Sequence, residues 1–116
     1  MRITHIYTGD DGESHFKDVE LKLEDRGDVG RVSELVKVNG IMFRETDGSY
    51  DLDFHNAPRR QYVINLDGFV EIETGDGTKR VFGPGEIFLA EDTTGRGHIS
   101  RAVDGQSRRS IFVTLE

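Results

Sequence analysis

The sequence contains no cysteine and no long apolar run. The absence of cysteine excludes thiol catalysis, zinc sites built from thiolates, and disulfide bonds. No window approaches the roughly 18 consecutive apolar residues that a membrane-spanning helix requires, and the opening residues Met1-Arg2-Ile3-Thr4-His5 do not resemble a signal peptide. We therefore expect a cytoplasmic protein that does not enter a membrane.

Positive charge is also scarce, because 15 Lys and Arg residues face 22 Asp and Glu residues, for a net charge of −7. No basic stripe interleaved with aromatic residues is present, so nucleic-acid binding is not expected. The Gly-x-Gly triplets at 75–77, 83–85 and 95–97 do not continue into a dinucleotide-binding loop, and no Gly-x-Ser-x-Gly nucleophile motif occurs. These absences leave other kinds of small-molecule site open.

The length of 116 residues fits one small domain, which buries only about 60–70% of its unfolded surface. Hydrophobic residues make up 34% of the chain, so the core must be compact or completed by a partner. No linker, repeat or low-complexity segment divides the chain. We expect a single domain over residues 1–116 that forms a homodimer, since an amino-terminal strand can pair with a neighbouring copy.

Short alternating segments separated by turn residues dominate the sequence. At residues 18–24 the strand interpretation is favoured over a helix, because a helix would leave Leu21 off the apolar face. No long helix is expected, and the pattern predicts an antiparallel sandwich or barrel. Strands are expected at residues 1–7, 18–24, 50–55, 62–66, 98–103 and 109–115, with two short strands in 32–45 hinged at Asn39-Gly40 and a hairpin turning at 75–77.

One histidine stands near each end of the segment from Asp53 to His98. Pro58, Gly68 and the glycine-rich turns that follow indicate that this segment folds back on itself. We therefore predict that His55 and His98 share one pocket, with their imidazoles within about 8 Å of each other.

The same segment resembles the two sequence motifs of the cupin superfamily over about residues 50–103. His55 matches the first histidine of the first motif and Gly68 its terminal glycine, while His98 matches the histidine of the second motif, after the turn at 83–85. The resemblance implies an all-β double-stranded β-helix, or jelly-roll barrel, of the kind that often dimerises. It specifies function poorly, because one fold hosts many functions.

Cupins typically bind one divalent metal (iron, manganese, nickel, copper or zinc) through three histidines and a carboxylate. Here Ala57 stands in place of the second histidine and Gln61 in place of the glutamate. The resemblance therefore leaves His55, Gln61 and His98 as an incomplete ligand set. Asp53 could supply the missing carboxylate, since on a regular strand it shares the face of His55. Glu91 and Asp92 are further candidates for that ligand, although Asp92 could equally serve to fix its own loop.

A metal-free site is the alternative. The pKa of histidine lies near 6.5, so His55 or His98 could act as a general base, oriented by Asp53 and partnered by Tyr62 or an arginine. Some sugar-epimerising cupins work in this way, and the arrangement here is loosely similar.

Other residues near the first histidine suggest ligand contacts. Arg59 and Arg60 could hold a carboxylate or phosphate, or could simply pair with neighbouring acids. The small side chain of Ala57 leaves space for a water or a ligand group. The sequence thus predicts a protein that binds a small polar or anionic metabolite, either as an enzyme or as a non-catalytic binding or structural protein.

Overall fold

A computed structural model describes all 116 residues, and the chain is all-β, as predicted. The one helical element is the three-residue 3-10 turn η1 (Gly27–Val29), so the structure contains no helix long enough to cross a bilayer. The strands are β1 (Arg2–Thr8), β2 (Ser14–Glu20), β3 (Glu24–Asp25), β4 (Arg31–Val32), β5 (Gly40–Thr46), β6 (Asp51–His55), β7 (Gln61–Asp67), β8 (Val70–Glu73), β9 (Lys79–Phe82), β10 (Ile87–Ala90), β11 (His98–Ala102) and β12 (Arg108–Thr114).

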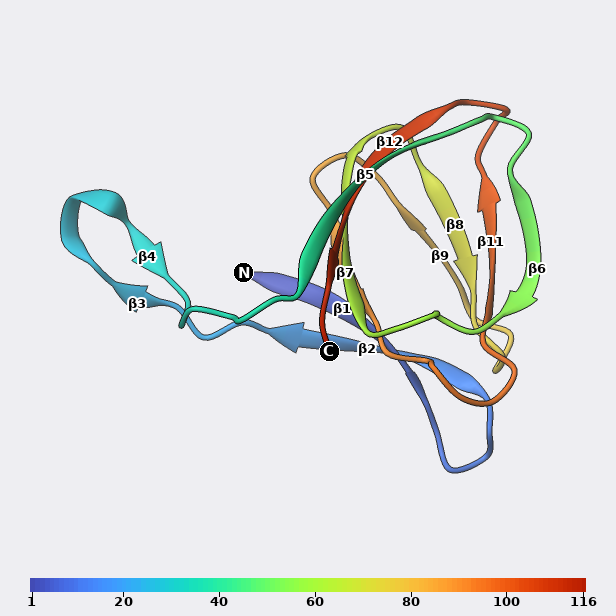
Figure 1. Cartoon of the computed structure of the whole chain (residues 1–116), viewed down its shortest axis with the longest axis horizontal. Coiled ribbons are helices and arrows are strands. Elements are labelled where there is room, and N and C mark those ends of the chain that lie inside the picture. The colour runs from blue at the N-terminus through green and yellow to red at the C-terminus, as the bar shows by residue number, and fades with distance from the viewer.

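Two main sheets face each other (Figure 1). The larger has the strand order β2-β1-β10-β7-β12-β5 and the smaller the order β6-β11-β8-β9. Hydrogen bonds do not join the two sheets into one closed barrel. From β5 onward the chain passes repeatedly from one sheet to the other, which places distant segments side by side. Strand β1 pairs in parallel with β10, whereas the other neighbouring strands are antiparallel.

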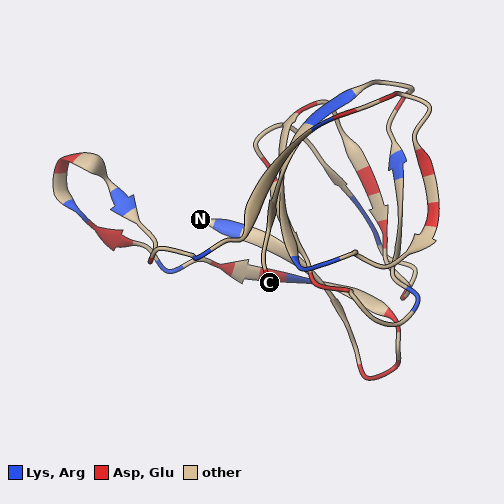
Figure 2. Ribbon diagram, in the orientation of Figure 1, with Lys and Arg blue, Asp and Glu red and all other residues tan.

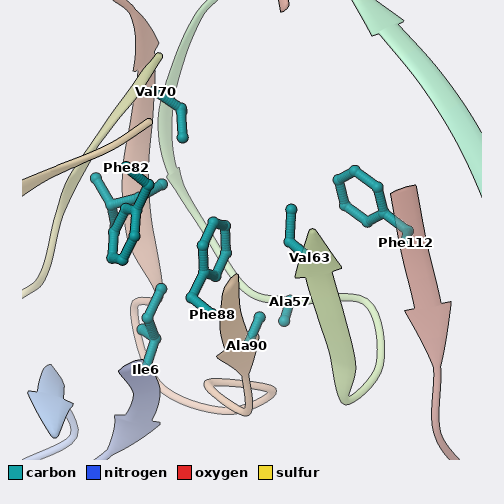
Figure 3. Close-up of a cluster of buried hydrophobic side chains, with 9 residues drawn as sticks. Ile6, Ala57, Val63, Val70, Phe82, Phe88, Ala90 and Phe112 are labelled. Carbon is teal, nitrogen blue, oxygen red and sulfur yellow. The ribbon is translucent and has the colours of Figure 1, made fainter. Parts of the chain in front are cut away.

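The core consists of nine buried apolar side chains that come from both sheets (Figure 3). The rings of Phe82 and Phe88 pack against each other within it, with their centroids 4.8 Å apart. Complete burial of one large apolar side chain contributes about 1.5–3 kcal/mol, so this cluster holds the two sheets together. Its members are Ile6, Ala57, Val63, Val70, Ile72, Phe82, Phe88, Ala90 and Phe112.

Between residues 18 and 45 the structure corrects the predicted strands. Strand β2 ends at Glu20, which pairs with Arg2 at the very start of β1. Residues 21–23 lie in no strand, and Glu24 belongs to the separate strand β3, which pairs with β4. The pair Asn39-Gly40 does not turn a hairpin, because β5 begins at Gly40 and pairs with β12 instead. The strands predicted nearer the carboxyl terminus are confirmed.

Residues 21–39, here called the arm, project away from the two main sheets and carry the small β3–β4 hairpin (Figure 1). The arm raises the radius of gyration to 14.7 Å, compared with about 13 Å for a compact domain of this length. Apolar side chains on it are exposed to solvent, among them Leu35, Val36 and Val38. Apolar side chains grouped on a projecting segment are typical of an interaction surface.

The amino-terminal strand cannot make the expected contact with a second copy, because β1 is already paired with β2 and β10. We propose that the homodimer forms through the arm instead, which would cover these side chains with a second copy of the chain. The double substitution Leu35→Asp and Val38→Asp should convert the dimer to a monomer, because it places charges in the contact. Light scattering measures the mass. Val81→Asp, at an exposed apolar position of β9, is the matched control and should leave the mass unchanged. A wild-type mass equal to one chain at every concentration would contradict the proposal.

Candidate functional site

A cavity of about 400 Å³ lies between the two sheets, and eleven of its nineteen lining residues are hydrophobic. This is the size and character of many small-molecule sites, which combine apolar walls with a few polar groups. No Asp or Glu lines the cavity. The polar or charged side chains in its wall are those of Arg44, Tyr50, His55, Arg59, Gln61, His98, Ser100 and Arg108.

The two predicted histidines lie side by side in this wall. Strands β6 and β11 are antiparallel neighbours, and their register places His55 opposite His98. The ring centroids are 4.5 Å apart and the ring planes are inclined by 56°. The prediction that the two imidazoles lie within about 8 Å of each other is confirmed.

Gly97 permits this close pairing. Its φ of +79° lies in the left-handed region, and a Cβ at this position would lie only 1.9 Å from the backbone oxygen of His55. Only glycine avoids both the strain and the collision. The residue before His98 therefore controls how closely β11 approaches the end of β6.

His98 is buried, and its Nδ1 lies 2.5 Å from Oδ2 of the fully buried Asp92. We assign the hydrogen bond as Nδ1–H donating to the carboxylate, which leaves Nε2 free to accept a proton or a hydrogen bond. The other carboxylate oxygen, Oδ1, is buried without a partner. Asp92, a candidate metal ligand from the sequence, thus orients His98 instead.

His55 is half-buried, and its Nδ1 lies 2.8 Å from the backbone oxygen of Asp53, to which it donates. Burial lowers the pKa of His55 below its ordinary value, and the proximity of His98 and the charge of Arg44 lower it further. The hydrogen bond to Asp53 and the charge of Asp92 oppose this shift but do not reverse it. Near neutral pH the ring is therefore uncharged, and Nε2 is its free nitrogen.

A bulge in the β6–β11 pairing removes Asp53 from the cavity wall. Between His98 and Ser100 the register shifts, so Ser100 pairs with Leu52, where a regular ladder would place Asp53. Leu52 therefore lines the cavity, whereas Asp53 is exposed and its carboxylate accepts a hydrogen bond from the backbone N–H of Phe54. This corrects the expectation that Asp53 shares the inward face of His55: it orients the ring through its backbone oxygen alone.

The remaining expected site residues divide between two surfaces. Ala57 and Gln61 line the cavity and are buried, and Oε1 of Gln61 has no hydrogen-bond partner. Tyr62 lies on the opposite face of β7, because side chains alternate along the strand, and it is not part of the cavity wall.

The two neighbouring arginines have different surroundings. Arg59 is exposed but belongs to the cavity wall. Arg60 lies outside it, where its Nε and an Nη atom each lie 2.9 Å from the same carboxylate oxygen of Glu91. The sequence allows these arginines either to bind an anionic ligand or to pair with neighbouring acids. For Arg60 the structure confirms the pairing with an acid.

Four polar residues of the cavity escaped the sequence analysis: Arg44, Tyr50, Ser100 and Arg108. Each lies in or next to a strand that the sequence predicts. The alternation of side chains between the two faces of a strand could have indicated that these residues face inward. Arg44 shares a face of β5 with Met42, and Arg108 follows the buried alternation of β12. The hydroxyl groups of Tyr50 and Ser100 lie 2.7 Å apart.

These residues do not fit a divalent metal. No group of three His, Cys, Asp or Glu side chains is close enough to hold an ion, and Gln61 adds only a neutral amide beside His55 and His98. Asp92 is already engaged by His98. The cavity also carries three arginines and no acid, so the local charge repels a cation.

Solved structures resemble this fold, although no family model matches the sequence and comparison with curated proteins gives no match. The conserved protein SPY1581 of unknown function from Streptococcus pyogenes aligns over 72% of this chain and 69% of its own, with a TM-score of 0.54 and 19% identity. Protein NMB1881 from Neisseria meningitidis aligns over 72% and 81%, with a TM-score of 0.52 and 16% identity.

A third structure, of a protein assigned as ethanolamine utilization protein Q from Salmonella typhimurium, aligns over 99% of this chain and 95% of its own. Its TM-score of 0.47 at 12% identity is too low to argue from. At the identities of the first two structures the likeness concerns the fold and not the function.

The substitution Gly97→Ala should disrupt the cavity. It adds a Cβ where the backbone of His55 already lies, in addition to left-handed strain of about 1–2 kcal/mol. Gly77→Ala is the matched control, because Gly77 has a similar φ of +87° but nothing within 4 Å of the added Cβ. Urea unfolding should show a distinctly larger loss for Gly97→Ala. Equal losses would mean that the approach of β11 to β6 does not depend on this glycine.

The pKa of His55, followed by NMR titration, should lie below the usual value of about 6.5. As pH falls below about 6.5, the unfolded chain binds this proton more readily than the native protein, so the free energy of unfolding should decrease. Replacing His55 with Gln should remove that decrease.

His15 provides an internal comparison with the opposite sign. Its hydrogen bond to Asp11 raises its pKa, and a second bond to Asp76 adds to the effect. Its contribution to stability is therefore present below about pH 6.5 and is lost as pH rises through its folded-state pKa. A measured pKa of His55 higher than that of His15 would contradict the described surroundings of both rings.

Proposed function

We propose that this protein is a cupin-type, jelly-roll protein that binds a small molecule in the cavity beside His55 and His98, without requiring a metal. The observation that carries the proposal is the cavity itself, where buried polar groups converge and Oε1 of Gln61 has no partner. A buried unpaired polar atom costs about 1–3 kcal/mol, and a bound ligand that hydrogen-bonds to it recovers this free energy.

The cupin assignment rests on the placement of the motif residues. The two sequence segments that resemble the cupin motifs supply adjacent strands, and their histidines face each other across one register position. Ala57, at the position of the missing histidine, lies in the wall of the same cavity. The likeness to two solved structures with TM-scores above 0.5 shows only that a similar fold occurs in other proteins.

Metal-free catalysis is a second candidate function, favoured by the buried pair of His98 and Asp92. The carboxylate would stabilise a positively charged imidazole, so Nε2 of His98 could take a proton from a bound molecule as a general base. Tyr50 and Ser100, hydrogen-bonded to each other at the cavity wall, offer hydroxyl groups for an oxygen of that molecule. Without such chemistry the same cavity serves binding alone.

The substitution Gln61→Leu provides the sharpest test of binding, because it removes the polar atoms of the side chain and leaves an apolar side chain in their place. It should weaken the binding of polar ligands and stabilise the empty protein by about 1 kcal/mol, since an unpaired buried group is lost. Tyr62→Phe, on the opposite face of β7, is the control. Binding is followed by NMR with small sugars, alcohols and keto acids, and stability by thermal unfolding.

The same NMR samples in D₂O distinguish an enzyme from a binding protein. Exchange of the carbon-bound protons of pyruvate for deuterium, lost in Asp92→Asn but kept in Asp53→Asn, would identify base catalysis by the pair. If none of the compounds shifts the signals of cavity residues, or if Gln61→Leu and Tyr62→Phe have the same effect, the proposed binding function is wrong.

A further inference from the structure

Arg108 is buried although its side chain carries a charge. It is only 6% exposed, and its Nε has no hydrogen-bond partner. Burial lowers the pKa of Arg108, the charge of Arg44 lowers it further, and only Tyr50 opposes the shift. Buried charges in proteins are normally paired, so this guanidinium lacks the counter-ion that its position calls for.

Arg44 adds a second positive charge to the same region. In the β5–β12 ladder Arg44 pairs with Ser110 and Arg108 with Thr46, which places the two arginines on adjacent strands, two positions apart. Both belong to the cavity wall, with their guanidinium carbons 5.3 and 6.0 Å from the centroid of the Tyr50 ring. Two like charges so placed repel each other unless an anion lies between them.

Further polar atoms close to the arginines also lack partners. The hydroxyl oxygens of Thr46 and Ser110, which are the ladder partners of Arg108 and Arg44, are buried without a hydrogen bond. Neither hydroxyl belongs to the cavity wall, so Nε of Arg108 is the unsatisfied group of this set that comes from a wall residue. A buried donor without a partner is rare in native proteins, and an acceptor bound beside Arg108 would satisfy it.

The rest of the molecule does not lack acids for its arginines. Positive and negative residues are spread over the whole ribbon (Figure 2), and the net charge is −7. The cavity, in contrast, contains three arginines and no acid. Six arginines elsewhere form ion pairs with Asp or Glu: Arg26, Arg60, Arg80, Arg96, Arg101 and Arg109.

We propose that the ligand is a small organic anion whose carboxylate or phosphate group binds between Arg44 and Arg108. This rests on the proposed function and specifies the class of ligand. Guanidinium groups hold such planar or tetrahedral anions through paired hydrogen bonds. The mostly hydrophobic cavity wall accommodates an apolar body next to the charged group.

The ligand also has a direction in the cavity. Arg44 and Gly40 are four residues apart on β5. Gly40 and Gln61 lie at the same level of the sheet, because both pair with Thr114 of β12. Four residues of strand span about 13 Å, so Arg44 and Gln61 lie at distinct levels of the cavity wall. The anionic group binds at the level of the arginines, and the opposite end of the ligand approaches Gln61.

Calorimetric titration with four probes tests this inference: hexanoate, hexyl phosphate, hexanol and inorganic phosphate. Hexanoate or hexyl phosphate should bind more tightly than hexanol, and comparison of the two identifies the preferred anionic group. Inorganic phosphate should bind more weakly than hexyl phosphate, because it lacks the apolar body. Arg108→Gln should weaken binding of the preferred anion roughly ten- to hundredfold, as expected for loss of a charge-assisted hydrogen bond.

Arg109→Gln is the matched control, since it removes the same charge from the next residue, which is exposed and pairs with Asp67 outside the cavity. It should leave binding unchanged. Arg108→Met provides a measurement that needs no ligand: it should raise the melting temperature of the empty protein, because an unpaired buried charge is removed.

Two results would overturn the inference. Equal binding of hexanol and hexanoate, unaffected by Arg108→Gln, would show that the cavity takes neutral molecules, and the proposed function would stand without its anion. The second result is that neither hexanoate nor hexyl phosphate binds at millimolar concentration, while polar neutral compounds still shift the NMR signals of cavity residues. This result would also show that the cavity takes neutral molecules and not anions. If no compound of either set binds, the proposed function itself fails. Arg44→Gln, at a half-buried position, repeats the test should Arg108→Gln not fold.

Discussion

The antiparallel pairing of β6 with β11 is the interaction on which the cavity depends. It brings His55 against His98, and its bulge sets which side chains of β6 face inward. Asp92 and Gly97 precede β11 and act on the same pairing, one by fixing the ring of His98 and the other by letting the backbones approach. A one-residue change in this register would turn the inward side chains outward.

The charge distribution of the cavity opposes that of the whole chain. A protein with a net charge of −7 encloses a space lined by three arginines and two histidines and by no Asp or Glu. Neither Arg44 nor Arg108 has an acidic partner to offset its burial, which reduces the stability of the ligand-free protein. Such an arrangement is found where binding sites are preorganised for a charge that the protein itself does not supply.

Much of this architecture could be predicted from local pattern, and the rest could not for identifiable reasons. The strands after position 50 follow alternation and turn residues, and the two histidines were expected to meet. Asp53 was misplaced because a bulge is invisible to an alternation rule, and residues beyond Glu20 were misplaced because strand length depends on the partner strand. Arg108 escaped because a charged residue on a buried face contradicts the usual rule for strands.

The parallel pairing of β1 with β10 constrains how this chain folds during synthesis. Thr4 pairs with Phe88, so the amino-terminal strand leaves the ribosome long before one of its two neighbours exists. Until then the nascent chain can form the local β1–β2 hairpin, but Ile3 and Ile6, which are buried in the finished protein, lack part of their cover. Pairing at such sequence distance is slow because a long loop must close first. The assembly of the larger sheet therefore waits for the carboxyl-terminal part of the chain, and the newly made amino terminus is the segment most exposed to wrong partners meanwhile.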